Sequence, residues 1–169
     1  VTDGNATELP VFVRGDHNTP ASMKQPRRFP QVLSEGKPLP DGSSGRLALA
    51  KWIAHKKNPL TARVLVNRVW RWHFGRGLVV TTDNFGLQGE QPSHPELLDW
   101  LAGWFMDNGW SIKKLNTLIL TSATYQMSTA ASPDALEGDP NNVLLSRAPL
   151  RRLEAEPLRD SLLELAGLL

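Results

Sequence analysis

Cysteine is absent from the 169-residue sequence, and this absence excludes several kinds of chemistry. Such a chain forms no disulfide, offers no thiolate nucleophile and binds no metal through sulfur. Long apolar runs are also missing, and none approaches the roughly 20 residues that a membrane-spanning helix needs. We therefore expect no membrane span. Apolar residues make up 40% of the sequence and charged residues 21%, which is typical of a globular domain.

Start and stop signals are missing at the two ends. The first ten residues, VTDGNATELP, lack the basic and then apolar order of a secretory signal. The last helical pattern continues to Leu168 and Leu169 without a stop signal. We interpret the sequence as an excised part of a longer chain.

Charge of one sign is missing from two consecutive segments. Residues 46–76 contain eight Lys and Arg residues and no acid, whereas residues 77–110 contain five acids and no Lys or Arg. One interpretation of the basic segment is binding to nucleic acid or another polyanion. We favour mutual neutralisation inside the fold, because exposed nucleic-acid binders carry an unbalanced basic face. We therefore expect no nucleic-acid partner.

Three arginines make this hypothesis specific. The helix predicted over residues 59–73 is apolar around nearly its whole circumference, which indicates a buried central helix. At least one of Arg63, Arg68 and Arg71 should then be largely buried and should require a carboxylate partner. Asp99 is the predicted partner, with Arg68 slightly preferred over Arg63.

Helical periodicity predicts an all-α fold of four or five packed helices with an extended, proline-rich N-terminal arm. The arm covers residues 1–45 and is expected to pack on a helical domain formed by residues 46–169. Six prolines disfavour a long helix in the arm, and residues 9–14 are predicted to form one short strand. A loop is expected over residues 129–146. The other helices are expected at 46–56, from 93 to about 108, at 112–125, and from about 150, with a kink or a restart near Glu156 because of Pro157.

Several residues match helix start and stop signals. Asn58 is a predicted N-cap, and Gly75 and Gly77 are predicted to end the second helix. Residues 93–96, SHPE, match a capping box in which the Ser93 hydroxyl caps the helix. Ser111 is the predicted cap of the following helix.

The segment between the second and third helices contains the candidate site residues. Asp83, His94 and Asp99 are the candidate catalytic groups, because carboxylates and imidazole carry out acid–base chemistry. The candidate binding residues are His73, Arg63, Arg68 and Arg71. The spacing of His73, Asp83 and His94 matches no compact ligand motif, so we expect no metal and no cofactor. Ser122 lacks the surrounding motif of a nucleophile, and most of the six tryptophans are expected in the core.

Several runs of the sequence together resemble a known family. They are RLALAKWI (46–53), NPLTARVLVNRVWRWHFGRGLV (58–79), NFG (84–86), PSHPELLDWLAGWF (92–105) and SIKKLNTLILTSATYQMS (111–128). This pattern resembles the planctomycete-specific C-terminal domain of unknown function. An acid often precedes the family's Phe-Gly pair, whereas Asn84 stands there in this sequence, with Asp83 just before it.

The resemblance implies a setting rather than a reaction. In this family the domain closes large exported proteins that often carry a cytochrome c-type haem module, so an exported location and a neighbouring haem domain are implied. We expect a non-catalytic helical interaction or ligand-binding module whose partners are other domains of the parent chain or a glycan. The alternative is a hydrolase acting on complex glycans, with its site on residues 83–99.

Overall fold

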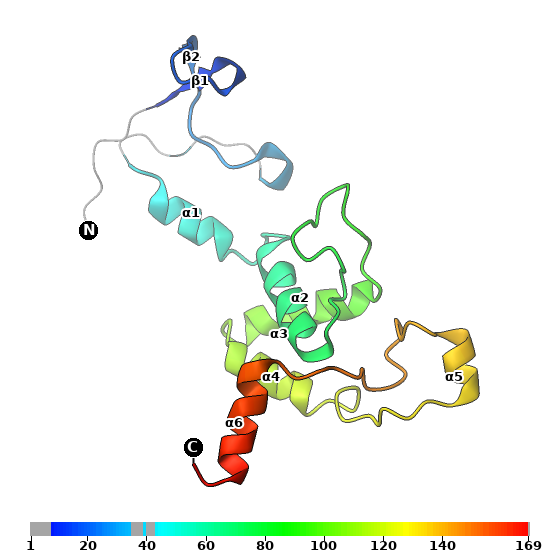
Figure 1. Cartoon of the computed structure of the whole chain (residues 1–169). Coiled ribbons are helices and arrows are strands. Elements are labelled where there is room, and N and C mark those ends of the chain that lie inside the picture. Colours follow the sequence, from blue (N-terminus) through cyan, green and yellow to red (C-terminus); the bar gives the residue numbers. More distant parts are fainter. Residues whose placement is uncertain (1–7, 35–38, 40–42, 169) are drawn as a thin grey trace. The chain divides into compact units, whose positions relative to one another are not determined.

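The computed structural model describes residues 8–34, 39 and 43–168 (Figure 1). The chain divides into two compact units, Val1–Ala62 and Arg63–Leu169. Helices provide most of the regular structure, and the described residues contain only a small two-stranded sheet. The predicted helical class is therefore confirmed. The predicted arm includes residues 1–7, 35–38 and 40–42, which lie outside the described residues, and its packing on the helical domain stays a prediction.

The first unit contains a short β-hairpin. Strand β1 (Pro10–Phe12) lies inside the predicted strand and pairs in antiparallel fashion with β2 (Pro20–Lys24), which the sequence analysis missed. The Asp16 carboxylate organises the turn, because it accepts hydrogen bonds from the Asn18 amide at 2.9 Å and from the Thr19 hydroxyl at 3.0 Å. Two 3-10 helices, η1 (Val13–Gly15) and η2 (Gln31–Leu33), complete the segment.

Helix α1 (Arg46–Ile53) is shorter than predicted and has no buried residue. Trp52 stacks on Phe29, with ring centroids 4.8 Å apart. Asn58 behaves as predicted: its side-chain oxygen accepts the amides of Leu60 and Thr61 at 3.0 and 3.2 Å, just ahead of the next helix.

The core of the second unit lies between three helices and one extended segment (Figure 1). The helices are α2 (Thr61–Phe74), α3 (Pro95–Asp107) and α4 (Ile112–Leu120). Leu78 and Val79 belong to residues 75–94, which connect α2 to α3 and which we call the joint. The buried apolar residues are Val66, Val69, Trp70, Phe74, Leu78, Val79, Leu98, Leu101, Ala102, Phe105, Leu115 and Ile119.

The joint is attached to α2 by a buried side chain. Asn67 is fully buried; its amide group donates to the Val79 carbonyl at 2.9 Å and its oxygen accepts from the Val79 amide at 2.9 Å. Such a reciprocal pair satisfies both main-chain groups of a residue that belongs to no helix or strand. Gly77 permits this approach, since an added Cβ there would lie 2.9 Å from both polar atoms of Asn67. The bonds tie the joint to the middle of α2.

Two predicted helix ends are confirmed and one predicted cap is wrong. Gly75 ends α2 with a positive φ of 79°, and the Ser111 hydroxyl accepts the Lys114 amide at 3.3 Å. Ser93 is not the cap of α3, whose N-cap is His94 without a side-chain hydrogen bond. Ser93 belongs instead to the joint, because its amide donates to the Leu78 carbonyl at 2.8 Å and its hydroxyl donates to the same oxygen at 3.3 Å.

The C-terminal third also differs from its prediction. The expected loop contains a short helix, α5 (Pro133–Gly138), which the Ser132 hydroxyl caps. Helix α4 stops at Leu120 rather than near Tyr125. The last helix, α6 (Ala155–Leu165), starts where Pro157 falls in its first turn, so the expected restart near Glu156 is correct and a start near Leu150 is wrong.

Replacing Asn67 with leucine should destabilise the chain by about 2–4 kcal/mol, because both main-chain groups of Val79 would lose their buried partner. The free energy of unfolding measured by chemical denaturation checks this value. Asn141→Leu, at an exposed loop position, is the matched control. Equal stability of the two variants would contradict the structural role of the pair.

The revised caps give a second prediction. Ser111→Ala should cost about 1 kcal/mol, because it removes a helix cap. Ser93→Ala should cost less than about 0.5 kcal/mol, because the exposed hydroxyl is lost while the main-chain bond to Leu78 remains. Thermal unfolding of the two variants side by side tests the order, and a larger loss for Ser93→Ala would restore the capping box.

Candidate functional site

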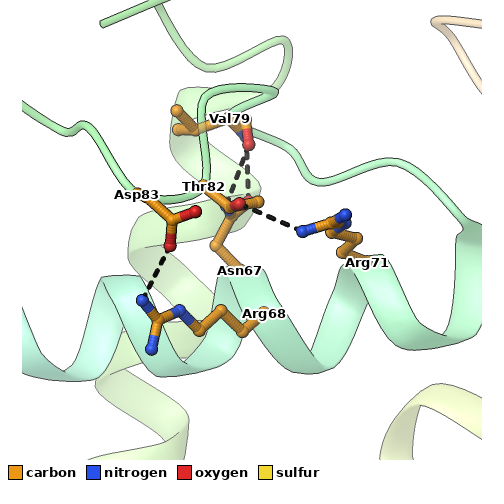
Figure 2. Close-up of polar contacts among 6 residues, drawn as sticks. All are labelled: Asn67, Arg68, Arg71, Val79, Thr82 and Asp83. Carbon is orange, nitrogen blue, oxygen red and sulfur yellow. Dashed lines mark hydrogen bonds and ion pairs between the residues drawn. The ribbon is translucent and has the colours of Figure 1, made fainter.

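The three arginines of the second helix project towards the joint and α3, and two of them meet a carboxylate. The Arg63 guanidinium bonds to Asp99 at 2.6 Å, and that of Arg68 bonds to Asp83 at 2.9 Å. Arg71 donates instead to the Thr82 hydroxyl at 3.2 Å (Figure 2). The predicted pairing of the basic and acidic segments is therefore confirmed, but the preferred partner of Asp99 is Arg63 rather than Arg68.

The predicted burial of these arginines is wrong. The side chains of Arg63 and Arg68 are 37% and 49% exposed, and Arg71 is exposed as well. The physical reason is that α2 is not enclosed on all sides, since Trp72 is also 64% exposed. Ion pairs at this exposure contribute about 0.2–1 kcal/mol, whereas the loss of one partner of a buried pair would cost about 3–5 kcal/mol.

Asp99 shows the electrical effect of its partner. The hydrogen bond from Arg63, reinforced by its positive charge, holds the pKa of the Asp99 carboxyl below its usual value. A carboxylate with this environment is a poor general base near pH 7, because efficient acid–base groups have pKa values near the working pH.

The two candidate histidines lie in different surroundings. His73 Nε2 lies 3.1 Å from Asn116 Oδ1, and its ring meets the edge of Tyr125 at a centroid distance of 5.7 Å. His94 Nδ1 lies 3.0 Å from the Ser93 hydroxyl oxygen. The described residues contain no group of three His, Asp or Glu side chains that could hold a metal ion.

The glycine-rich part of the joint closes on itself. The Thr81 hydroxyl donates to the Asn84 carbonyl at 2.9 Å and accepts the Glu90 amide at 3.0 Å. Gly89 must be glycine here, because an added Cβ would lie 2.1 Å from the Asn84 carbonyl oxygen. The Thr81 hydroxyl therefore connects the start of this loop to Asn84 and Glu90.

Two separate depressions lie on the second unit. A groove of about 450 Å³, which we call the arginine groove, is lined by Arg71, Gly75, Arg76, Gly77 and residues 80–84. A larger one of about 700 Å³, the aromatic cleft, is lined by Trp72, His73, Phe74, Tyr125, residues 148–154 and Pro157. The structure thus brings Arg71 and Asp83 to the first and His73 to the second. Arg63, Arg68, His94 and Asp99 line neither.

The aromatic cleft contains residues that the sequence analysis missed. Arg151 donates to the carbonyls of Trp72 and His73 at the end of α2, the second at 3.3 Å. Tyr125 contacts Phe74, with ring centroids 5.8 Å apart. A basic residue far along the sequence gives no local signal of this contact. Most of the six tryptophans were expected in the core, but Trp70 alone is buried, Trp52, Trp104 and Trp110 are half-buried, and Trp72 and Trp100 are 64% and 55% exposed.

The lowered pKa of Asp99 predicts a pH dependence. Asp99→Asn should lower the free energy of unfolding at pH 6 by less than about 1 kcal/mol, because the pair is exposed. The folded pKa is depressed, so the contribution is present above the unfolded pKa of about 3.9 and is lost as pH falls through the lower folded value. Denaturation of parent and variant between pH 6 and pH 2 should therefore converge at the acid end.

Two controls accompany this measurement. Asp134→Asn removes an exposed carboxylate on α5 and should not reproduce the convergence. In an Arg63→Gln background, Asp99→Asn should have little further effect, because the partner is already gone. A constant difference across the pH range would contradict the assignment.

Comparison with known proteins identifies a family but no activity. No curated protein and no solved structure matches the chain. A family model described as "Protein of unknown function (DUF1553)" matches residues 45–169, which is most of the sequence. No helix among the described residues is long and apolar enough to cross a membrane. The chain belongs to the DUF1553 family of proteins of unknown function.

Proposed function

We propose that this chain is a non-catalytic helical module of a large exported multidomain protein, and that it binds a ligand or partner domain through the aromatic cleft. The observation that carries the proposal is that the candidate catalytic groups do not meet in one depression: Asp83 lines the arginine groove, whereas His94 and Asp99 line neither depression. Asp83 is bonded to Arg68, Asp99 to Arg63 and His94 to Ser93, so each has its own structural partner. Asp99 thereby links α3 to α2 and Asp83 links the joint to α2, which favours a structural role for both carboxylates.

The alternative is a hydrolase acting on complex glycans. Most glycosidases use two carboxyl groups beside the scissile bond, and the general acid has a raised pKa. Asp99 has a lowered pKa, which is the opposite of what an acid catalyst needs. Asp83 faces the arginine groove, but no second carboxylate lines that groove within the described residues. These features favour binding over hydrolysis.

The aromatic cleft has the composition of a recognition surface. Trp72 and Tyr125 are 64% and 39% exposed although both are large aromatic side chains. Leu150 and Arg152 lie along the same cleft. Exposed Trp, Tyr and Arg residues are enriched where proteins bind other proteins, and aromatic rings also stack on sugars. Both classes of occupant fit the proposed setting, in which the parent chain carries other domains, a haem domain among them, and meets glycans outside the cell.

Catalysis is tested with the candidate carboxylates. The purified chain should release no more reducing ends from complex glycans than the Asp83→Asn and Asp99→Asn variants release. A release that both variants abolish, with thermal unfolding within a few degrees of the parent, would overturn the non-catalytic proposal in favour of the hydrolase.

Binding is tested with a matched pair of tryptophan variants. Trp72→Ala should weaken binding about tenfold, whereas Trp100→Ala should not, because Trp100 is also more than half exposed but does not line the cleft. Affinity electrophoresis in gels containing soluble glycans and titration with separately purified domains of the parent chain provide the readouts. Equal effects of the two variants would show that the cleft is not the binding surface.

A further inference from the structure

The arginine groove carries positive charge that the described part of the fold leaves without a carboxylate. Of the three arginines on α2, Arg63 and Arg68 bond to Asp99 and Asp83. Among the described residues, the Arg71 side chain bonds only to the neutral Thr82 hydroxyl, through one of its five N–H donors (Figure 2). Arg76, just beyond the end of α2, makes no hydrogen bond or ion pair within the described residues, and both side chains line the groove.

The nearby acids do not cancel this charge. Asp83 lines the groove, but its carboxylate is bonded to Arg68 at 2.9 Å. The pKa of Asp139 is lowered by main-chain hydrogen bonds, and the charge of Arg147 lowers it more than that of Arg76 does, so Asp139 is a partner of Arg147 before Arg76. Arg71 and Arg76 therefore remain as the net charge of the groove.

The negative end of the α2 dipole is the main opposing effect. A helix C-terminus carries the equivalent of about half a negative charge, which two guanidinium groups exceed. The Arg151 guanidinium also donates to the carbonyls of Trp72 and His73, so this helix end already has a cation of its own. The net charge at the groove is therefore positive.

The groove is preformed by main-chain bonds. The Asn67–Val79 pair fixes the chain just before the lining residues 80–84. These residues are held by bonds from the Thr82 amide to the Val80 carbonyl and from the Asn84 amide to the Thr81 carbonyl, both 2.9 Å. Gly75 and Gly77 add no side chains to its wall. A fixed floor lowers the entropic cost of binding a small group.

We propose that the arginine groove is a binding site for an oxyanion group of a ligand, which Arg71 and Arg76 hold by charge-assisted hydrogen bonds. The planar guanidinium fork matches carboxylate, phosphate and sulfate oxygens in bidentate geometry. At about 450 Å³ the groove suits one small unit, such as an acidic sugar or a phosphorylated group, rather than a long chain. The residues of this groove do not line the aromatic cleft, so the inference does not depend on the function proposed there.

The test follows the arginine side chains directly by NMR. The Nε–Hε signals of the full 169-residue chain are recorded during titration with inorganic phosphate, inorganic sulfate or galacturonate at constant ionic strength. The signals of Arg71 and Arg76, assigned with Arg71→Lys and Arg76→Lys, should shift together and saturate. Those of the carboxylate-paired Arg63 and Arg68 should not. The anion that saturates at the lowest concentration identifies which of the three chemistries the site takes.

Variants separate binding from folding. Arg76→Gln should raise the dissociation constant about tenfold or more, since it removes one charged hydrogen-bonding partner. The Arg76 side chain makes no hydrogen bond or ion pair in the described fold, so the thermal unfolding of the Arg76→Gln variant should match that of the parent. Arg159→Gln, on α6, is the control and should bind as the parent does. Shifts that never saturate, that appear equally at all arginines, or that persist unchanged in Arg76→Gln would overturn the proposal.

Discussion

The reciprocal hydrogen bonds between the Asn67 side chain and the Val79 main chain are the constraint on which the second unit depends. A buried amide on a helix is costly unless all its bonds are made, and a buried strand-like segment without a neighbouring strand has the same problem. The Asn67 side chain and the Val79 main chain satisfy each other's hydrogen-bonding groups. The joint can therefore cross the apolar side of α2 without a sheet, and Leu78 and Val79 enter the core.

The positions of the charged residues follow from this attachment. Once the joint is held against α2, Asp83 lies within reach of Arg68, and Thr82 within reach of Arg71. The return of the chain into α3 then brings Asp99 to Arg63. Two arginines of the basic segment thus pair with two acids of the acidic segment, whereas Arg71 meets a neutral hydroxyl. Their exposure keeps the stabilisation small, so these pairs select the register of packing more than they supply stability.

The sequence predicted the helical class, the glycine stop at Gly75 and the Ser111 cap, because these features depend on local periodicity and local hydrogen bonds. It also predicted that the arginines of α2 pair with acids of the following segment. Their burial was overestimated, because the count of apolar residues around α2 does not reveal which sides other elements cover. The SHPE motif was misread for a related reason: a distant carbonyl, that of Leu78, competes for Ser93. Neither depression was predicted. Arg151 contacts α2 from far along the chain. The sequence also does not show that Arg71, unlike Arg63 and Arg68, meets no carboxylate among the described residues.

The Asn67–Val79 pair also governs how this part of the molecule opens to solvent. The Val79 amide belongs to no helix or strand, and amides in such segments usually exchange their hydrogens quickly through local fluctuations. Here the acceptor is a side chain seated in the middle of α2, and Val79 is only 2% exposed. The amide can reach water only when the joint lifts from the helix and uncovers the core. We therefore expect the Val79 amide to exchange as slowly as the amides of the three-helix core, so that its exchange rate reports the separation of the joint from α2.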